Sequence, residues 1–264
     1  GVVLPDITNP FFGEYARALE VAAAAYGYVL VIANSDANEA HESRIVSDLT
    51  NRHVDGLLIG SAFPSSAFGP ITLPGRPIVL IDRSVPIPGY AAVGANSREG
   101  ARVLVEHLIT VHGHQSIPLI TGGESSADPR EQGWGDAFQS HGLPPGPIMR
   151  TNFSYRGGYE ATRRLLNWPT PPRAIFAAAD QLGIGALKAI RQAGLRCPED
   201  IAVVCYDGTT ESEYCWPPLT VARQPIQAMA EAAVAAVLEP SSSAVHQQFA
   251  TELIIRESCG CKAP

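Results

Sequence analysis

The segment IAVVCYDGTTESEYCWPPLTVARQP, residues 201–225, decides the fold of this chain. Its first six residues form an apolar run that is typical of a β-strand buried on both faces, as in a parallel sheet. The run ends at Asp207-Gly208, which is a turn signal. In open α/β sheets ligands bind at the carboxyl ends of the strands. Asp207 is therefore either a ligand contact or a turn residue that bonds its own backbone, and this segment alone leaves both open.

Strand and helix patterns alternate on both sides of this segment. We expect strands over 2–4, 28–32, 54–59, 77–81, 91–93, 116–121, 148–152, 174–177 and 248–255, and helices over 10–26, 39–52, 97–112, 129–141, 155–166, 181–193 and 226–238. Pro118 inside a predicted strand implies an edge strand or a bulge. Alternating βα units in two blocks predict an α/β fold of two lobes with parallel sheets and right-handed crossovers. Two such lobes favour a small ligand in the cleft between them.

Composition limits the classes of function. The 264 residues are 45% hydrophobic and 17% charged, which is typical of a well-packed globular protein with one or two domains. No apolar run reaches the roughly 18 residues of a membrane span. The net charge of −7 gives no basic footprint for nucleic acid, so we expect that this chain does not hold DNA on its own. The sequence begins in a strand without Met, and we expect it to be a fragment.

No metal, cofactor or catalytic site is expected from the motifs. The five cysteines are odd in number and one of them, Cys205, lies in an apolar strand, which suits a reducing compartment such as the cytoplasm. Cys259-Gly-Cys261 lacks a second pair, and His112-Gly-His114 is interpreted as a helix-end turn. We find no Gly-x-Ser-x-Gly elbow, no phosphate loop and no Gly-x-Gly-x-x-Gly after a strand, so we do not expect an enzyme.

Seven segments, in order along the chain, resemble the effector-binding core of the lactose-repressor/galactose-repressor family of bacterial transcription regulators. They are LPDITNPFFGEY (4–15), NSDANEAHES (34–43), VDGLLI (54–59), EGARVLVEHLITVHGHQSI (99–117), REQGWGDAF (130–138), AAADQLGIGALKAIRQAGLRCPEDIAVVCYD (177–207) and ELIIRES (252–258). The resemblance implies two lobes, like those of a periplasmic sugar-binding protein, joined by three chain crossings. It puts the crossings near 111–114, 222–225 and 244–248. Lobe one would be 1–111 plus 226–244, and lobe two 115–222 plus 248–264.

The resemblance also implies a function. The chain would be the core of a cytoplasmic, homodimeric repressor that senses a sugar, a sugar derivative or a purine and controls operator DNA through a helix-turn-helix headpiece that lies outside it. The identity of the effector, and whether it releases or promotes DNA binding, stay open. A periplasmic solute-binding protein of a transporter, with the same two lobes, is the alternative.

Three charged residues are candidate ligand contacts. Arg130 matches the ligand-contacting arginine of the family, and its planar fork suits paired bonds to hydroxyls, carboxylates or purine edges; a solvated surface arginine is the alternative. Asp207 would accept from ligand hydroxyls or ring N–H groups. Glu99 lies where some sugar-binding members place a carboxylate.

Aromatic walls would complete the pocket. Phe11 and Phe12 match ring positions of purine-binding members, and Phe153 and Phe176 match pocket aromatics of the second lobe; ordinary core packing is the alternative for each. Where a sugar-responsive member offers an asparagine before Asp180, this chain has Ala179, which puts a simple galactoside in doubt. Asp180 itself is expected to cap the helix that follows it.

Overall fold

The chain folds into two compact α/β units in a computed structural model. The model describes residues 1–61, 76–85, 87–123, 128–239 and 246–262. Unit 1 comprises Gly1–Ala95 and Pro225–Phe249, and unit 2 comprises Asn96–Gln224 and Ala250–Pro264. The crossing expected near 244–248 falls partly outside the described residues.

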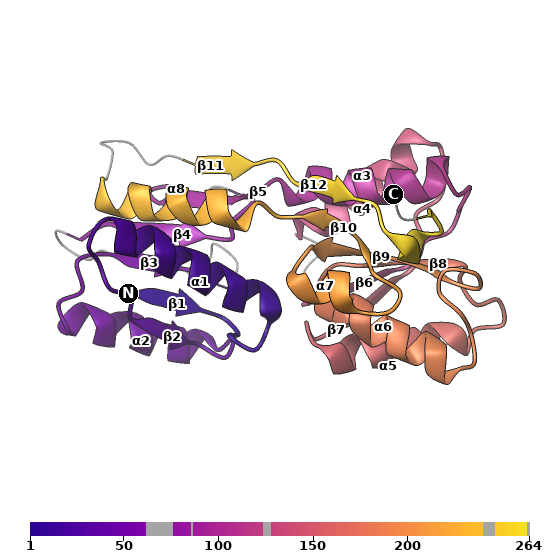
Figure 1. Cartoon of the computed structure of the whole chain (residues 1–264), viewed down its shortest axis with the longest axis horizontal. Coiled ribbons are helices and arrows are strands. Elements are labelled where there is room, and N and C mark those ends of the chain that lie inside the picture. Colours follow the sequence, from indigo (N-terminus) through magenta and orange to yellow (C-terminus); the bar gives the residue numbers. More distant parts are fainter. Residues whose placement is uncertain (62–75, 86, 124–127, 240–245, 263–264) are drawn as a thin grey trace. The chain divides into compact units, whose positions relative to one another are not determined.

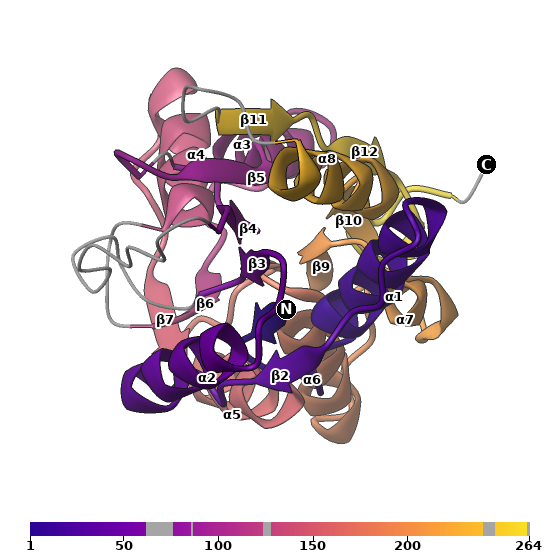
Figure 2. The same cartoon turned by 90° about the vertical axis from the view of Figure 1, so that its left-hand side faces the viewer.

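Unit 1 is a six-stranded sheet between two helix layers. Its strands follow the order β11-β5-β4-β3-β1-β2 and pair in parallel, with bounds β1 Val2–Leu4, β2 Ile32–Asn34, β3 Leu57–Ile59, β4 Ile78–Ile81, β5 Ala91–Ala95 and β11 His246–Phe249. Helices α1 (Pro10–Ala25) and α8 (Ile226–Leu238) pack together on one face, and α2 (Glu39–Asn51) lies on the other (Figure 2). The short apolar strands are buried on both faces, as a helix-covered parallel sheet requires.

Unit 2 repeats this architecture. Its sheet has the order β12-β10-β9-β8-β6-β7, with bounds β6 Leu119–Gly122, β7 Ile148–Thr151, β8 Ala174–Ala177, β9 Ala202–Asp207, β10 Thr220–Arg223 and β12 Glu252–Ile254. Helices α3 (Ser97–Thr110) and α4 (Pro129–Ser140) pair on one face, and α5 (Tyr155–Leu166) and α6 (Asp180–Gln192) pair on the other (Figure 1). Short α7 (Thr210–Tyr214) and the 3-10 turn η2 (Glu257–Cys259) complete it. Strand β12 at the edge pairs antiparallel with β10, and the other strands of this sheet pair in parallel. The predicted fold class, two α/β lobes with parallel sheets, is therefore confirmed for all strands of the two sheets but β12.

The helix α3 belongs to unit 2 and not to the first lobe, where its expected boundary near residue 111 would have put it. Its buried residues Leu104, Val105 and Leu108 pack with Trp134 and Phe138 of α4 in one hydrophobic cluster. The first boundary between the units therefore lies between residues 95 and 96. The other two boundaries follow Gln224, inside the expected crossing at 222–225, and Phe249, just after the one expected at 244–248.

Several strands differ from the expectations. Strand β2 (Ile32–Asn34) shares only its first residue with the strand expected over 28–32. Strand β6 starts at Leu119 and is central, pairing with β7 and β8, because Pro118 stands just before the strand and removes no hydrogen bond from it. The strand expected over 248–255 is two strands, β11 in unit 1 and β12 in unit 2. The strand β10, which pairs in parallel with β9, was not expected. No helix in the described part of the chain has the length and apolar character needed to cross a membrane.

Candidate functional site

Arg130 lies at the carboxyl edge of the unit 2 sheet and is held in place by an ion pair. It is the second residue of α4, where Asp128 is the N-cap and accepts a hydrogen bond from the Arg130 backbone N–H at 2.9 Å. The Asp128 carboxylate also accepts bonds from Nε at 3.0 Å and from Nη2 at 2.8 Å. The Nη1 atom donates to the carbonyl of Ala178, just after β8, at 2.8 Å. These bonds orient the guanidinium group, whose side chain is 21% exposed.

The charge of this ion pair persists at neutral pH. Burial acts to raise the pKa of Asp128, but the charge of Arg130 and its hydrogen bonds outweigh burial and lower that pKa below its ordinary value. A carboxylate beside an always-charged guanidinium makes a rigid polar pair that a ligand hydroxyl can bind.

Two aromatic rings flank the guanidinium group. The Cζ atom of Arg130 lies 4.9 Å from the ring centroid of Phe153 and 5.7 Å from that of Tyr206. Phe153 follows β7 and lies against Gly122 at the end of β6, where any Cβ atom would collide with its ring. The carboxyl ends of β6, β7, β8 and β9 thus meet around Arg130, which agrees with the rule that such edges bind ligands. Phe153, which we expected to be a pocket aromatic, lies beside Arg130. Tyr206 lies beside it as well, and sequence analysis missed this ring because it assigned Tyr206 to the interior of a strand.

Asp207 ends β9 in an unusual backbone conformation. Its φ is 110°, a value that non-glycine residues rarely adopt, and the residue is 4% exposed. Gln224 holds it twice, because the Gln224 side chain donates to the Asp207 carboxylate at 3.0 Å and its backbone N–H donates to the Asp207 carbonyl at 2.9 Å. Backbone strain of this kind gathers at functional sites. Both readings of Asp207, ligand contact and turn residue, are compatible with these contacts.

Asp180 does not cap its own helix, contrary to the expectation. The N-cap of α6 is Ala179, and the Asp180 carboxylate accepts instead from the backbone N–H of Thr209 at 2.6 Å and from its hydroxyl at 2.8 Å. The side chain reaches across to the loop after β9 and is 2% exposed. Burial raises the pKa of Asp180 to about 7. Asp180 therefore ties the end of β8 to the loop that follows Asp207.

Glu99 lies in the first turn of α3, apart from the contacts of Arg130. Its carboxylate pairs with Arg102 at 2.8 and 2.5 Å, and a hydrogen bond from Arg102 lowers the pKa of Glu99. It lines a pocket of unit 2 with Asn96, Gly100, Val103, Ala222, Ala250, Thr251 and Leu253. A ligand there would compete with Arg102 for this carboxylate.

The other three candidate phenylalanines pack in the hydrophobic cores. Phe176 is completely buried in the middle of β8, so the structure does not bring its ring to the carboxyl edge. Phe11 and Phe12 belong to unit 1, at the start of α1, where Asn9 caps the helix by accepting from the Phe11 backbone N–H. Phe11 is 2% exposed and its ring lies 5.1 Å from that of Phe12, which is partly buried against the same core.

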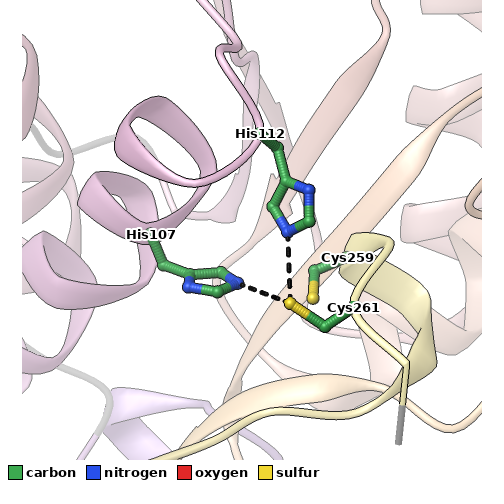
Figure 3. Close-up of side chains that lie close together, drawn as sticks. All are labelled: His107, His112, Cys259 and Cys261. Atoms are coloured by element: carbon green, nitrogen blue, oxygen red, sulfur yellow. Dashed lines mark hydrogen bonds between the residues drawn. The ribbon is translucent and has the colours of Figure 1, made fainter.

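A second cluster of reactive side chains lies elsewhere in unit 2. His107, His112, Cys259 and Cys261 bring one donor atom each to within 4.8 Å of one another (Figure 3). The expectation of no metal-ligand grouping was based on spacing along the chain, which pairs His112 with His114. The structure instead joins two histidines at the end of α3 to two cysteines about 150 residues later.

Comparison with known proteins identifies relatives over most of the chain. The family model described as "Periplasmic binding protein-like domain" matches residues 105–259. The ribose operon repressor of Escherichia coli K12 is 32% identical over 260 residues, which cover 96% of this chain and 78% of that protein. The HTH-type transcriptional repressor CytR of the same organism is 32% identical over 229 residues, covering 85% of this chain and 67% of CytR.

A solved structure shares the fold over the full length. The LacI family transcriptional regulator from Enterococcus faecium with bound ribose has a TM-score of 0.86 and 29% identity, with 100% of this chain and 98% of that chain covered. These relatives are transcription regulators and not enzymes. Together with the two α/β units, they show that this chain belongs to the LacI family of ligand-responsive transcription regulators and is its effector-binding core.

Proposed function

We propose that this core binds a small sugar through the carboxyl edge of unit 2. The supporting observation is the guanidinium of Arg130, oriented by Asp128 and the Ala178 carbonyl and stacked near Phe153. A charged fork with an aromatic face suits a polyol ring, whose hydroxyls are paired and whose C–H groups are apolar. Asp207 would accept from further hydroxyls, and Phe11, Phe12 and Glu99 are the remaining candidate contacts.

A pentose is the first sugar class to test. The Enterococcus faecium relative holds ribose, and the Escherichia coli repressor of 32% identity is named for the ribose operon. Purine nucleosides are the second class, because they carry a pentose and add a ring that can stack on phenylalanine. Ala179, in place of an asparagine, argues against a simple galactoside.

Operator control would pass through a helix-turn-helix headpiece and a homodimer in the cytoplasm. The core has a net charge of −7, so its own surface does not favour DNA. The segment before β2, at the edge of the unit 1 sheet, exposes Val29 at 90% and Val31 at 51%. An exposed apolar edge of this kind favours pairing with a second copy. A dimer would align two headpieces on a pseudo-palindromic operator.

A thermal-shift series tests the proposal. Purified core is heated with ribose, other pentoses, hexoses and purine nucleosides, and at a hundred times its dissociation constant the effector should add about 2.7 kcal/mol of stability. We expect a shift with a pentose or a pentose-bearing nucleoside. No shift with any of these ligands would contradict the proposal.

Sedimentation tests whether the core behaves as a transcription regulator or as the solute-binding protein of a transporter. The core should sediment as a dimer at micromolar concentration. With a headpiece attached, the sugar that shifts the melting temperature should also change affinity for operator DNA. A monomer that binds sugar with no effect on DNA would favour the solute-binding protein.

A further inference from the structure

Two histidines and two cysteines converge at the amino edge of the unit 2 sheet. His107 lies in the last turn of α3, and His112 follows the end of that helix by two residues. Cys259 ends η2, and Cys261 follows it across Gly260. Both imidazole rings turn their Nε2 atoms toward the Cys261 sulfur, and the Cys259 sulfur lies beside it (Figure 3).

The distances match a tetrahedral metal site. The Cys261 Sγ lies 3.4 Å from His112 Nε2 and 3.7 Å from His107 Nε2. Zinc holds sulfur at about 2.3 Å and imidazole nitrogen at about 2.0–2.1 Å, which at tetrahedral angles separates the two ligands by about 3.6 Å. All four donor atoms lie within 4.8 Å of one another, so small side-chain rotations bring them to one ion.

The turn that carries the cysteines is anchored to the sheet. The Ser258 hydroxyl donates to the Val203 carbonyl at 2.5 Å and accepts from the Thr220 backbone N–H at 2.8 Å. Gly260 has a φ of 104°, and a Cβ atom there would lie 3.3 Å from the His112 ring. The chain thus turns closely around His112, and both cysteines face α3 on a well-supported segment.

The type of ligand selects the metal. Thiolate and imidazole donors suit Zn²⁺ and its chemical neighbours, whereas Ca²⁺ and Mg²⁺ require oxygen ligands. His107 is 8% exposed and Cys259 is 2% exposed, and four protein ligands leave no position for a substrate. Closed sites of two cysteines and two histidines are structural. The pair His107-x4-His112 also has the spacing usual for the histidines of such sites.

We propose that His107, His112, Cys259 and Cys261 form a structural Zn²⁺ site that fastens the carboxyl-terminal segment to the end of α3. On binding, the two thiols each release a proton to solvent and coordinate as thiolates, while the imidazoles coordinate through Nε2. This proposal is independent of the effector proposal, since none of the four residues contacts Arg130 or Asp207 in the described contacts.

Cobalt(II) titration of the reduced, chelator-treated core tests the site. We expect one cobalt ion per chain, with the visible absorption of tetrahedral cobalt and a thiolate charge-transfer band, and displacement by one equivalent of zinc. Cys261→Ser and His112→Gln should lose the tetrahedral spectrum. Cys215→Ser and His141→Gln are the matched controls, because they remove a thiol and an imidazole of the same unit outside the cluster.

Zinc should also raise the melting temperature of the wild type and of both controls, and not that of Cys261→Ser. If Cys261→Ser fails to fold, His112→Gln carries the test, because His112 is only partly buried. Two results would overturn the proposal. One is no thiolate band in the reduced wild type, and the other is a cobalt spectrum that Cys261→Ser and His112→Gln retain.

Discussion

The two edges of the unit 2 sheet carry different chemistry. At the carboxyl edge the Asp128 carboxylate and the rings of Phe153 and Tyr206 surround the Arg130 guanidinium group. At the amino edge the chain presents thiols and imidazoles. Strand direction explains the contrast. Loops that leave a parallel sheet at its carboxyl edge are free to vary around a ligand, whereas the amino edge is tied together by Ser258, β9 and β10. One edge suits exchangeable ligands and the other a permanent one.

The largest effect should come from pH acting on Asp180 at the carboxyl edge. Burial raises the pKa of Asp180 to about 7, above the value near 3.9 of an unfolded aspartate. The folded state therefore binds the proton more tightly, and the contribution of Asp180 to the free energy of unfolding falls as pH rises from about 4 to about 7, by a few kcal/mol at most. Urea unfolding at several pH values measures the slope, which Asp180→Asn should reduce. Asp48→Asn, on the exposed face of α2, is the control. If the free energy of unfolding of Asp180→Asn depends on pH as steeply as that of the wild type, other groups cause the pH dependence.

Replacing Arg130 should have the next largest effect, on ligand affinity. Arg130→Ala removes charge-assisted bonds worth about 1.5–3 kcal/mol, which corresponds to a roughly 10- to 150-fold lower affinity for the effector. It also removes the ion-pair partner of the Asp128 carboxylate, so the free energy of unfolding should fall as well. The affinity is measured by calorimetric titration with the sugar that raises the melting temperature of the wild type.

Arg130→Lys separates these two losses. Lysine keeps a positive charge beside Asp128 but loses the planar fork, so stability should largely recover while affinity stays low. Arg164→Lys, an exposed position on α5, should change neither. Affinity in Arg130→Ala equal to that of the wild type would remove Arg130 from the site.

Asp207→Asn should have a smaller effect. The amide keeps the shape and tolerates positive φ, so the backbone at 110° should persist. It loses the charge that accepts ligand hydroxyls, and we expect about tenfold weaker binding, which corresponds to about 1.4 kcal/mol. The measurement is the effector concentration at half-maximal thermal shift. If Asp207→Asn reaches its half-maximal shift at the same effector concentration as the wild type, Asp207 is only a turn residue.

The smallest effect should be the coupling between the two edges. Strand β9 has six residues, so its ends lie about 20 Å apart, and sites at this separation usually act additively within about 0.5 kcal/mol. Saturating zinc should therefore change the effector dissociation constant by less than about threefold. Titration of effector into zinc-loaded and chelator-treated core measures this ratio. A much larger ratio would mean that the metal regulates the effector site.

The sequence predicted the carboxyl edge better than the amino edge, for a physical reason. Asp207 follows a strand pattern directly, so the rule for parallel sheets could place it at this edge, whereas Arg130, in the first turn of a helix, was selected by its match to the ligand-contacting arginine of the family. The fold class followed from the same alternation. His107 and Cys259 carry no such local signal, because tertiary packing alone joins α3 to the carboxyl-terminal segment.

The structure also differs from the expectations where the sequence pattern of a segment does not show what that segment packs against. Residues 97–112 were expected to be a helix and form α3, but nothing in their periodicity tells which core will cover them. The ring of Phe176 is buried in the core because helices cover both faces of this sheet, so a residue in the middle of β8 packs against a helix layer on whichever face it lies. Tyr206 was read as a strand interior, yet its ring lies 5.7 Å from the Arg130 guanidinium.

The double hold of Gln224 on Asp207 has a mechanical consequence. Gln224 is the last residue of unit 2 before the chain passes into unit 1 at Pro225. A hydroxyl that donates to the Asp207 carboxylate would share or displace the Gln224 amide, which donates to the same group. The residue that contacts Asp207 would thus also be the last one before the chain enters unit 1. Ligand binding would then change the hydrogen bonds of the segment that enters unit 1, and Gln224→Ala should remove this connection while leaving the ligand bound.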